Sequence, residues 1–328
     1  MVLVAPDSFK GTFSAREVAR AIAGGLRDGG LEAEELPIGD GGEGTMDALV
    51  ATLGGEVHKR TVSDPLGRPV KASFAILPDG RAVVEMAQAS GLGLVKEGER
   101  DAWAASTRGT GELIVAAVDA GSSEVLVTVG GSATTDGGAG AIEALREAGG
   151  PGDAAIVILA DVRTPFERAA RVFGPQKGAD AAAVKRLERR LERFAAKLPK
   201  DPRGVAHSGA AGGLAGGLWA AFGARLEPGA PFVLDAVGYD ARARAAFAVV
   251  LGEGRLDETT LHGKAVFEAA TRARQMGVPA HAVVGQDRLD PFGKRIMDLQ
   301  HVLEATDERE LEAAGAELAR VLEAERRP

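Results

Sequence analysis

The sequence predicts an α/β protein in which a discontinuous, flavodoxin-like, doubly wound domain carries a second, inserted α/β domain. Short apolar strands alternate with amphipathic helices at both ends of the 328-residue chain, two strands at the start and three at the end. Near residue 57 this pattern changes to shorter strands joined by Pro/Gly turns. We therefore predict one domain from 1–57 plus 240–328 and an inserted domain from 58–239.

Composition excludes several classes of protein. The formal charge of −8 argues against nucleic acid or an anionic membrane as the main partner, because both need a basic surface. The chain contains no cysteine, which excludes disulfides, thiolate metal sites and a cysteine nucleophile. It shows no signal peptide and no run of about 18 apolar residues, so no membrane span and a cytoplasmic location are expected. The oligomeric state is left open, a homodimer included.

The first 57 residues read as strand, loop, helix, strand. An apolar run over 2–5 predicts a buried parallel strand, and the loop that follows carries Asp7, Ser8 and Lys10. Ser14 and Glu17 form a capping box before a helical pattern. A second strand over 34–38 ends in the glycine-rich run 39–44, after which a helix begins.

The middle of the chain predicts three antiparallel strands and then α/β units. The strands are expected over 58–64, 70–77 and 82–86, with turns at PLGR and PDGR. A helix over 110–121, buried strands over 124–129 and 156–160, and an amphipathic helix over 184–198 follow. The charged face of that last helix is interpreted as solvated surface.

The α/β pattern returns from about residue 240. Strands are expected over 246–251, 280–284 and 299–303, with a helix over 264–276 and a final helix capped by Asp307 and Glu310. In a flavodoxin-like strand order, the strand over 246–251 lies beside the first strand, at the switch point. The loops 7–11 and 252–257 should then face each other, with 39–44 close by.

Three loops combine glycine with chemically active side chains. The run GDGGEG over 39–44 matches a dinucleotide-binding pattern, but that pattern also needs an acidic residue about 20 positions later, where a domain crossing is expected. GGSATTDGG over 130–138 offers three hydroxyls and one carboxylate in a backbone open to an anion. GEGRLD over 252–257 places two carboxylates and a guanidinium at the end of a strand, a set that suits Mg²⁺ and phosphate.

Other catalytic signatures are missing from the sequence. It has no Walker A motif, no protein-kinase signature, no zinc spacing among the five histidines and no G-x-S-x-G elbow. Taken alone, the loops FGPQKGA over 173–179 and 208–217 are better explained as structural.

Seven ordered blocks resemble the type I glycerate kinase family. They are APDSFKG at 5–11, GDGGEGT at 39–45, GTGEL at 109–113, GGSATTDGG at 130–138, FGPQKGA at 173–179, GAAGGL at 209–214 and GEGRLD at 252–257. The resemblance covers nearly the whole chain, and it implies ATP, Mg²⁺ and D-glycerate, with 2-phosphoglycerate as product and the active site in an interdomain cleft. The segment between Leu145 and Ile156 is shorter than the family pattern.

Phosphoryl transfer to glycerate then assigns roles to the loop residues, because it needs cations, a metal and a carboxylate near the attacking hydroxyl. Candidate catalytic residues are Asp40, Asp136 and Lys10. Candidate substrate-binding residues are Asp7, Ser8, Ser132, Thr134, Lys177 and Arg255. Glycines whose backbone would hold nucleotide or phosphate are Gly41, Gly42, Gly130, Gly131 and Gly254. Glu253 and Asp257 are the candidate Mg²⁺ ligands.

Alternative functions remain open at this point. Within kinases they are phosphorylation of glycerate at C3, or a kinase for another small hydroxy acid. Outside kinases they are a nucleotide-dependent oxidoreductase, resting on the run 39–44, and a non-catalytic binding protein for a small ligand.

Overall fold

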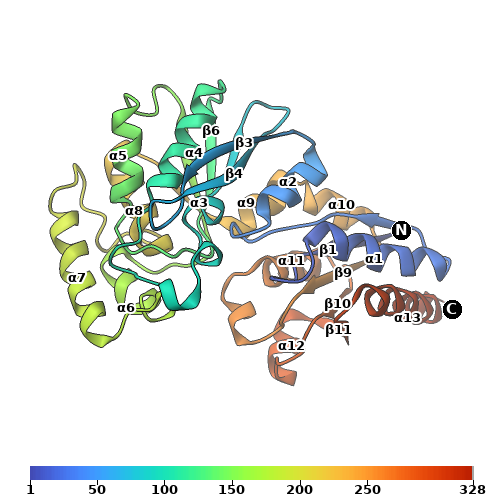
Figure 1. Cartoon of the computed structure of the whole chain (residues 1–328). Coiled ribbons are helices and arrows are strands. Elements are labelled where there is room, and N and C mark those ends of the chain that lie inside the picture. Colours follow the sequence, from blue (N-terminus) through green and yellow to red (C-terminus); the bar gives the residue numbers. More distant parts are fainter. Residues whose placement is uncertain (327–328) are drawn as a thin grey trace. The chain divides into compact units, whose positions relative to one another are not determined.

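A computed structural model describes residues 1–326 of the chain as two compact units (Figure 1). Within the described residues, the first unit comprises 1–40, 47–53 and the chain from 230 onward, and the second comprises 41–46 and 54–229. The first unit is thus built from both ends of the chain. This division into units does not test the predicted domain boundaries at 57 and 240, which remain a prediction.

The first unit is a five-stranded parallel sheet in the order β11-β10-β9-β1-β2. Its strands are β1 (Val2–Pro6), β2 (Ala33–Glu35), β9 (Ala248–Glu253), β10 (Ala280–Val284) and β11 (Leu299–Glu304). Counted along the chain this is the order 2-1-3-4-5, so the predicted flavodoxin-like arrangement is confirmed, with β9 beside β1.

Helices cover both faces of this sheet. They are α1 (Ala15–Asp28), α2 (Thr45–Leu53), α9 (Gly229–Ala236), α10 (Tyr239–Ala245), α11 (Ala265–Gln275), α12 (Pro291–Met297) and α13 (Glu308–Arg326). Helices α1 and α13 share one apolar cluster with β1 and β9, and α11 contacts β9 and β10 from the other face. The capping box of α1 is present as predicted, with Ser14 and Glu17 bonding each other's backbone. Helix α13 crosses α1 so closely that a Cβ on Gly25 would lie 1.9 Å from the Glu312 carbonyl oxygen.

The second unit is a six-stranded mixed sheet in the order β3-β4-β5-β6-β7-β8. Its strands are β3 (Glu56–Ser63), β4 (Pro69–Ile76), β5 (Ala82–Glu85), β6 (Glu124–Thr128), β7 (Ala155–Ala160) and β8 (Arg225–Pro228). The pairs β3–β4 and β4–β5 are antiparallel, and the remaining pairs are parallel. The longer helices are α4 (Arg108–Asp119), α5 (Ala139–Glu147), α7 (Ala181–Ala195) and α8 (Leu214–Phe222). The shorter helices are α3 (Ala87–Ser90), α6 (Ala169–Phe173), η1 (Leu92–Leu94), η2 (Glu97–Glu99), η3 (Phe166–Arg168), η4 (Pro175–Lys177) and η5 (Ala210–Gly213).

Some predicted elements differ in extent or were missed. Strand β9 begins and ends two residues later than predicted, because the Ala246 N–H bonds back to Arg242 at the end of α10 while Glu253 still pairs with Val284. Strand β5 is antiparallel to β4, as predicted, and it also pairs in parallel with β6, which the sequence did not indicate. Strand β8 was not predicted, since only four residues pair and none of them is fully buried. None of the helices in the described residues is both long and apolar enough to cross a membrane.

Candidate active site

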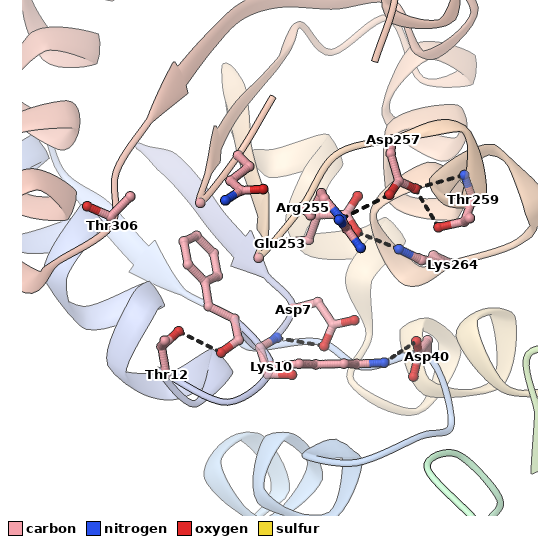
Figure 2. A pocket seen from close by; sticks show the side chains of 15 residues that line it. Asp7, Lys10, Thr12, Asp40, Glu253, Arg255, Asp257, Thr259, Lys264 and Thr306 are labelled. Atoms are coloured by element: carbon pink, nitrogen blue, oxygen red, sulfur yellow. Dashed lines mark hydrogen bonds and ion pairs between the residues drawn. The ribbon is translucent and has the colours of Figure 1, made fainter. Parts of the chain in front are cut away.

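A pocket of about 460 Å³ opens in the first unit where β1 and β9 end side by side (Figure 2). The Asp7 N–H donates to the Gly252 carbonyl at 2.8 Å, so the loops after the two strands start from adjacent backbone. The side chains that line the pocket include Asp7, Ser8, Lys10, Asp40, Glu253, Arg255, Asp257, Lys264 and Thr306. The predicted meeting of loops 7–11 and 252–257 is confirmed, and Asp40, from the run 39–44 that was expected close by, lines the same pocket.

Three carboxylates of this pocket are almost completely buried: Asp7, Asp40 and Glu253. Asp7 accepts a hydrogen bond from the Ser8 N–H at 2.6 Å. Burial, and then the negative charge of Asp40, raise the pKa of Asp7 from 3.8 to about 8, although Lys10 lowers it. The pocket therefore concentrates negative charge that favours a cation or a proton.

Each of the other two buried carboxylates has a lysine partner. The Lys10 ammonium lies 3.3 Å from Asp40, and about half of the Lys10 side chain is exposed. Lys264 lies 3.0 Å from Glu253, which also accepts a hydrogen bond from the Thr260 hydroxyl at 2.7 Å. Burial raises the pKa of Glu253 in spite of Lys264. Figure 2 shows Lys10 and Lys264 reaching the pocket from different loops.

Asp257 and Arg255 form the outer part of the pocket. Their side chains pair at 3.1 Å, and Arg255 is 64% exposed. Asp257 also caps the short helix η6 (Glu258–His262), accepting from the Thr259 N–H and hydroxyl, and these bonds hold its pKa below its usual value. Arg255 is thus the most accessible cation at this rim.

The second unit holds the other predicted loop, 130–138, between β6 and α5. Its glycines are required by space and by backbone conformation. A Cβ on Gly130 would lie 2.7 Å from the Gly42 Cα, and Gly131, Gly137 and Gly138 have positive φ. The Val129 N–H donates to the Gly41 carbonyl at 3.0 Å. The glycine runs 41–44 and 130–131 therefore pack backbone against backbone.

Asp136 is buried in this loop and accepts hydrogen bonds from two segments, one before α4 and one at the start of α5. Its carboxylate receives the N–H and hydroxyl of Thr107, at 2.9 and 2.8 Å, and the N–H groups of Gly138 and Gly140, at 3.0 and 3.1 Å. These bonds tie the start of α5 to the start of α4. A carboxylate that accepts four hydrogen bonds from the surrounding chain is typical of a residue that orders a loop.

Lys177 is fully buried behind the same loop. Its ammonium donates to the Ser132 hydroxyl oxygen at 2.7 Å and to the Thr134 carbonyl at 2.5 Å. Burial lowers the pKa of Lys177 from 10.5 to about 7, while the charge of Asp136 raises it. Ser132, at 8% exposed, is the more accessible end of this contact.

The loop also packs against the run 209–214. A Cβ on Gly212 would lie 2.0 Å from the Thr134 carbonyl oxygen, and Ala211, Gly212 and Gly213 all adopt left-handed conformations. Within residues 1–326, the buried hydroxyls of Thr134 and Thr135 have no hydrogen-bond partner. The loop thus keeps hydrogen-bonding capacity that its own neighbours leave unused.

The structure groups the predicted residues into two sets, one in each unit. The pocket of the first unit contains Asp7, Ser8, Lys10, Asp40, Glu253, Gly254, Arg255 and Asp257. The loops of the second unit contain Gly41, Gly42, Gly130, Gly131, Ser132, Thr134, Asp136 and Lys177. Sequence reasoning missed Lys264, Thr306 and Thr107; for Lys264 the only signal was the pair GK, which does not match a Walker A motif.

Comparison with known proteins identifies the family. The model of the glycerate kinase family matches residues 2–148 and 150–327. This chain belongs to the glycerate kinase family. Membership confirms the resemblance of the seven blocks and the prediction of a kinase. The interruption at residue 149 falls in the turn between α5 and β7, where the chain was expected to be short.

Individual members of the glycerate kinase family agree with this assignment. A glycerate kinase of Bacillus subtilis (strain 168) is 40% identical, with 87% of this chain and 84% of the relative covered. A glycerate 2-kinase of Escherichia coli (strain K12) is 37% identical over the same shares. The crystal structure of a protein assigned as glycerate kinase 2 from Salmonella typhimurium LT2 has a TM-score of 0.85 at 33% identity, covering 99% of this chain and 98% of that one.

Proposed function

We propose that this protein transfers the γ-phosphoryl group of ATP to D-glycerate, giving 2-phosphoglycerate and ADP. The observation that carries the proposal is the pocket at the switch point of the first sheet, where buried carboxylates and lysines converge in a member of the glycerate kinase family. Transfer to the C2 hydroxyl is supported by the name of the Escherichia coli relative, a glycerate 2-kinase. A cytoplasmic location and a homodimer stay predictions.

Phosphoryl transfer needs a carboxylate to accept the proton of the attacking hydroxyl. We assign this task to the buried pair Asp7 and Asp40, which line the same pocket. The negative charge of Asp40 raises the pKa of Asp7. A base acts best when its pKa is near the working pH, and the pKa of Asp7, about 8, meets that condition. Asp136 already receives four hydrogen bonds, so we assign it to ordering loop 130–138.

The substrate anions need cations and N–H groups. Lys10 and Arg255 are exposed enough to reach glycerate or a phosphate, and Lys264 lies in the same pocket. Their ion pairs with carboxylates hold them in place until an anion arrives. The backbone of Gly254 and the hydroxyl of Ser8 complete the polar lining. Lys10→Ala should raise KM for glycerate or ATP at least tenfold, and unchanged KM values for both reactants would count against this role.

Glu253 and Asp257 fit a magnesium ion that arrives with ATP. Among residues 1–326 no three His, Cys, Asp or Glu side chains are grouped as a ready metal site. Mg²⁺ in nucleotide sites needs only one or two carboxylates, because phosphate oxygens and water complete its shell. The ion would neutralise phosphate charge during transfer. We propose that Lys264 and Arg255 then exchange these carboxylates for phosphate oxygens.

A coupled assay of ADP release with D-glycerate, ATP and Mg²⁺ tests the proposal. We expect turnover with D-glycerate and none when glycerate is omitted. Absence of ADP release with D-glycerate, but turnover with another small hydroxy acid, would reassign the substrate. NMR of the product separates 2-phosphoglycerate from 3-phosphoglycerate, and the 3-isomer would overturn the regiochemistry.

A further inference from the structure

The segment that carries Lys177 is built so that its side chain has one position. Pro175 begins the short helix η4, and Gly178 follows Lys177 with a φ of +89°. A Cβ on Gly178 would lie 2.9 Å from the Arg100 carbonyl oxygen, so the chain there depends on glycine. The Phe173 ring lies 6.0 Å from the Lys177 ammonium. The backbone around Lys177 and the Phe173 ring therefore hold the ammonium in position before any ligand binds.

Both hydrogen-bond acceptors of Lys177 are neutral oxygens, from Ser132 and Thr134. A buried cation is normally paired with a carboxylate, because taking a charge out of water is unfavourable. Asp136 contributes its field to Lys177 but bonds Thr107, Gly138 and Gly140 instead. The positive charge of Lys177 is thus directed at the loop itself, which suits an anion bound on that loop.

The bond from Lys177 also decides what the Ser132 hydroxyl does. A hydroxyl has one proton and two acceptor lone pairs. Since Ser132 accepts from the ammonium at 2.7 Å, its own O–H proton points away from Lys177 and is available as a donor. A hydroxyl oxygen that accepts from a cation becomes a stronger donor, because neighbouring hydrogen bonds polarise one another.

We propose that Lys177 is a positioning residue that acts through Ser132, turning the Ser132 hydroxyl into a donor to an oxyanion of one reactant. The oxyanion is the carboxylate of glycerate or a phosphoryl oxygen of ATP, which share this chemistry. The inference rests on the proposed function, and it changes the role expected for Lys177 from direct ligand to support. Its burial at 1% exposed is the reason for that change.

Steady-state kinetics of Lys177→Met, Ser132→Ala and the double variant test the coupling. Met keeps the apolar stem of Lys177 and removes the charge. We expect each single variant to lose at least tenfold in kcat/KM. We expect the double variant to have about the same kcat/KM as the more impaired of the two single variants. Losses that multiply in the double variant, or a Lys177→Met variant within threefold of wild type, would overturn the proposal. Lys185→Met, an exposed lysine on α7, is the matched control and should stay within twofold.

A raised KM for glycerate would identify the oxyanion as the glycerate carboxylate. A raised KM for ATP would identify it as a phosphoryl oxygen of ATP. Circular dichroism and urea unfolding show whether the Met variant folds. If it does not, Ser132→Ala carries the test alone, since it leaves the bond from Lys177 to Thr134 in place; unchanged KM values in that folded variant would overturn the donor role.

Failure of the proposed function would look different. Wild-type protein would then release no ADP with D-glycerate, whatever the variants do. In that case calorimetry with inorganic phosphate tests the inference separately. Phosphate binding at least tenfold weaker in Ser132→Ala than in wild type would support it, and equal binding, or none to wild type, would refute it.

Discussion

Lys177→Met should change how the stability of this protein depends on pH. The pKa of Lys177 is about 7 in the folded chain against 10.5 in an unfolded one. Between these values the unfolded chain binds more protons at this site, so the free energy of unfolding rises with pH. Below pH 7 the lysine is charged in both states, and the unfavourable burial of the charge is present in full.

The size of this effect follows from the two pKa values. One pKa unit corresponds to about 1.4 kcal/mol, so the wild type should gain about 2 kcal/mol over the Met variant between pH 7 and pH 9. The difference in free energy of unfolding between wild type and Lys177→Met has a part that does not change with pH, which includes the two lost hydrogen bonds. The part that changes with pH comes from the charge of Lys177. The comparison therefore isolates the charge of Lys177.

Urea unfolding followed by circular dichroism at pH 6, 7, 8 and 9 measures this difference. The control is Lys185→Met, whose difference from wild type should stay flat because that lysine is exposed. A difference between wild type and Lys177→Met that is constant within about 0.5 kcal/mol across this range would refute the reasoning, because one proton must be lost if the pKa is lowered.

Further predictions concern the pocket and the loop. Asp40→Asn and Asp136→Asn should each lower kcat at least about 100-fold, Asp40→Asn because a base is lost and Asp136→Asn because loop 130–138 loses order. Only Asp136→Asn should also lower the free energy of unfolding, because its amide offers one oxygen to the four donors that two carboxylate oxygens accept from now. The exposed Asp28→Asn is the control; near-normal turnover in Asp40→Asn would remove Asp40 from the chemistry, and near-normal turnover in Asp136→Asn would contradict its ordering role. Because the raised pKa of Asp7 leaves it protonated below about 8, kcat/KM should rise with pH towards that value, and Asp7→Asn should abolish the rise; a flat profile in the wild type contradicts the assignment. Gly212→Ala should lower the free energy of unfolding by more than Gly149→Ala, by about 2 kcal/mol or more, because both have positive φ but only Gly212 meets the Thr134 carbonyl; equal losses in urea unfolding would show that the contact yields.

Much of the fold could be predicted because it depends on local patterns. The capping box at Ser14 marks the start of helix α1, and the strand-loop-helix order at both chain ends predicts parallel strands; both signals come from residues close together in the sequence. Strand β8 and the short helices from residue 210 to 245 were not predicted, since their residues carry no clear period and are held by tertiary packing.

The sequence by itself determined the flavodoxin-like strand order and the pocket that Asp7, Asp40 and Glu253 share, because carboxyl ends of adjacent parallel strands meet at one edge of a sheet. Only the tertiary structure decided what each side chain does there. Lys177 is read from sequence as an anion ligand, yet packing buries it against Ser132, 45 positions away. Burial and neighbouring charges are properties of packed space, and they set the pKa values of Asp7 and Lys177.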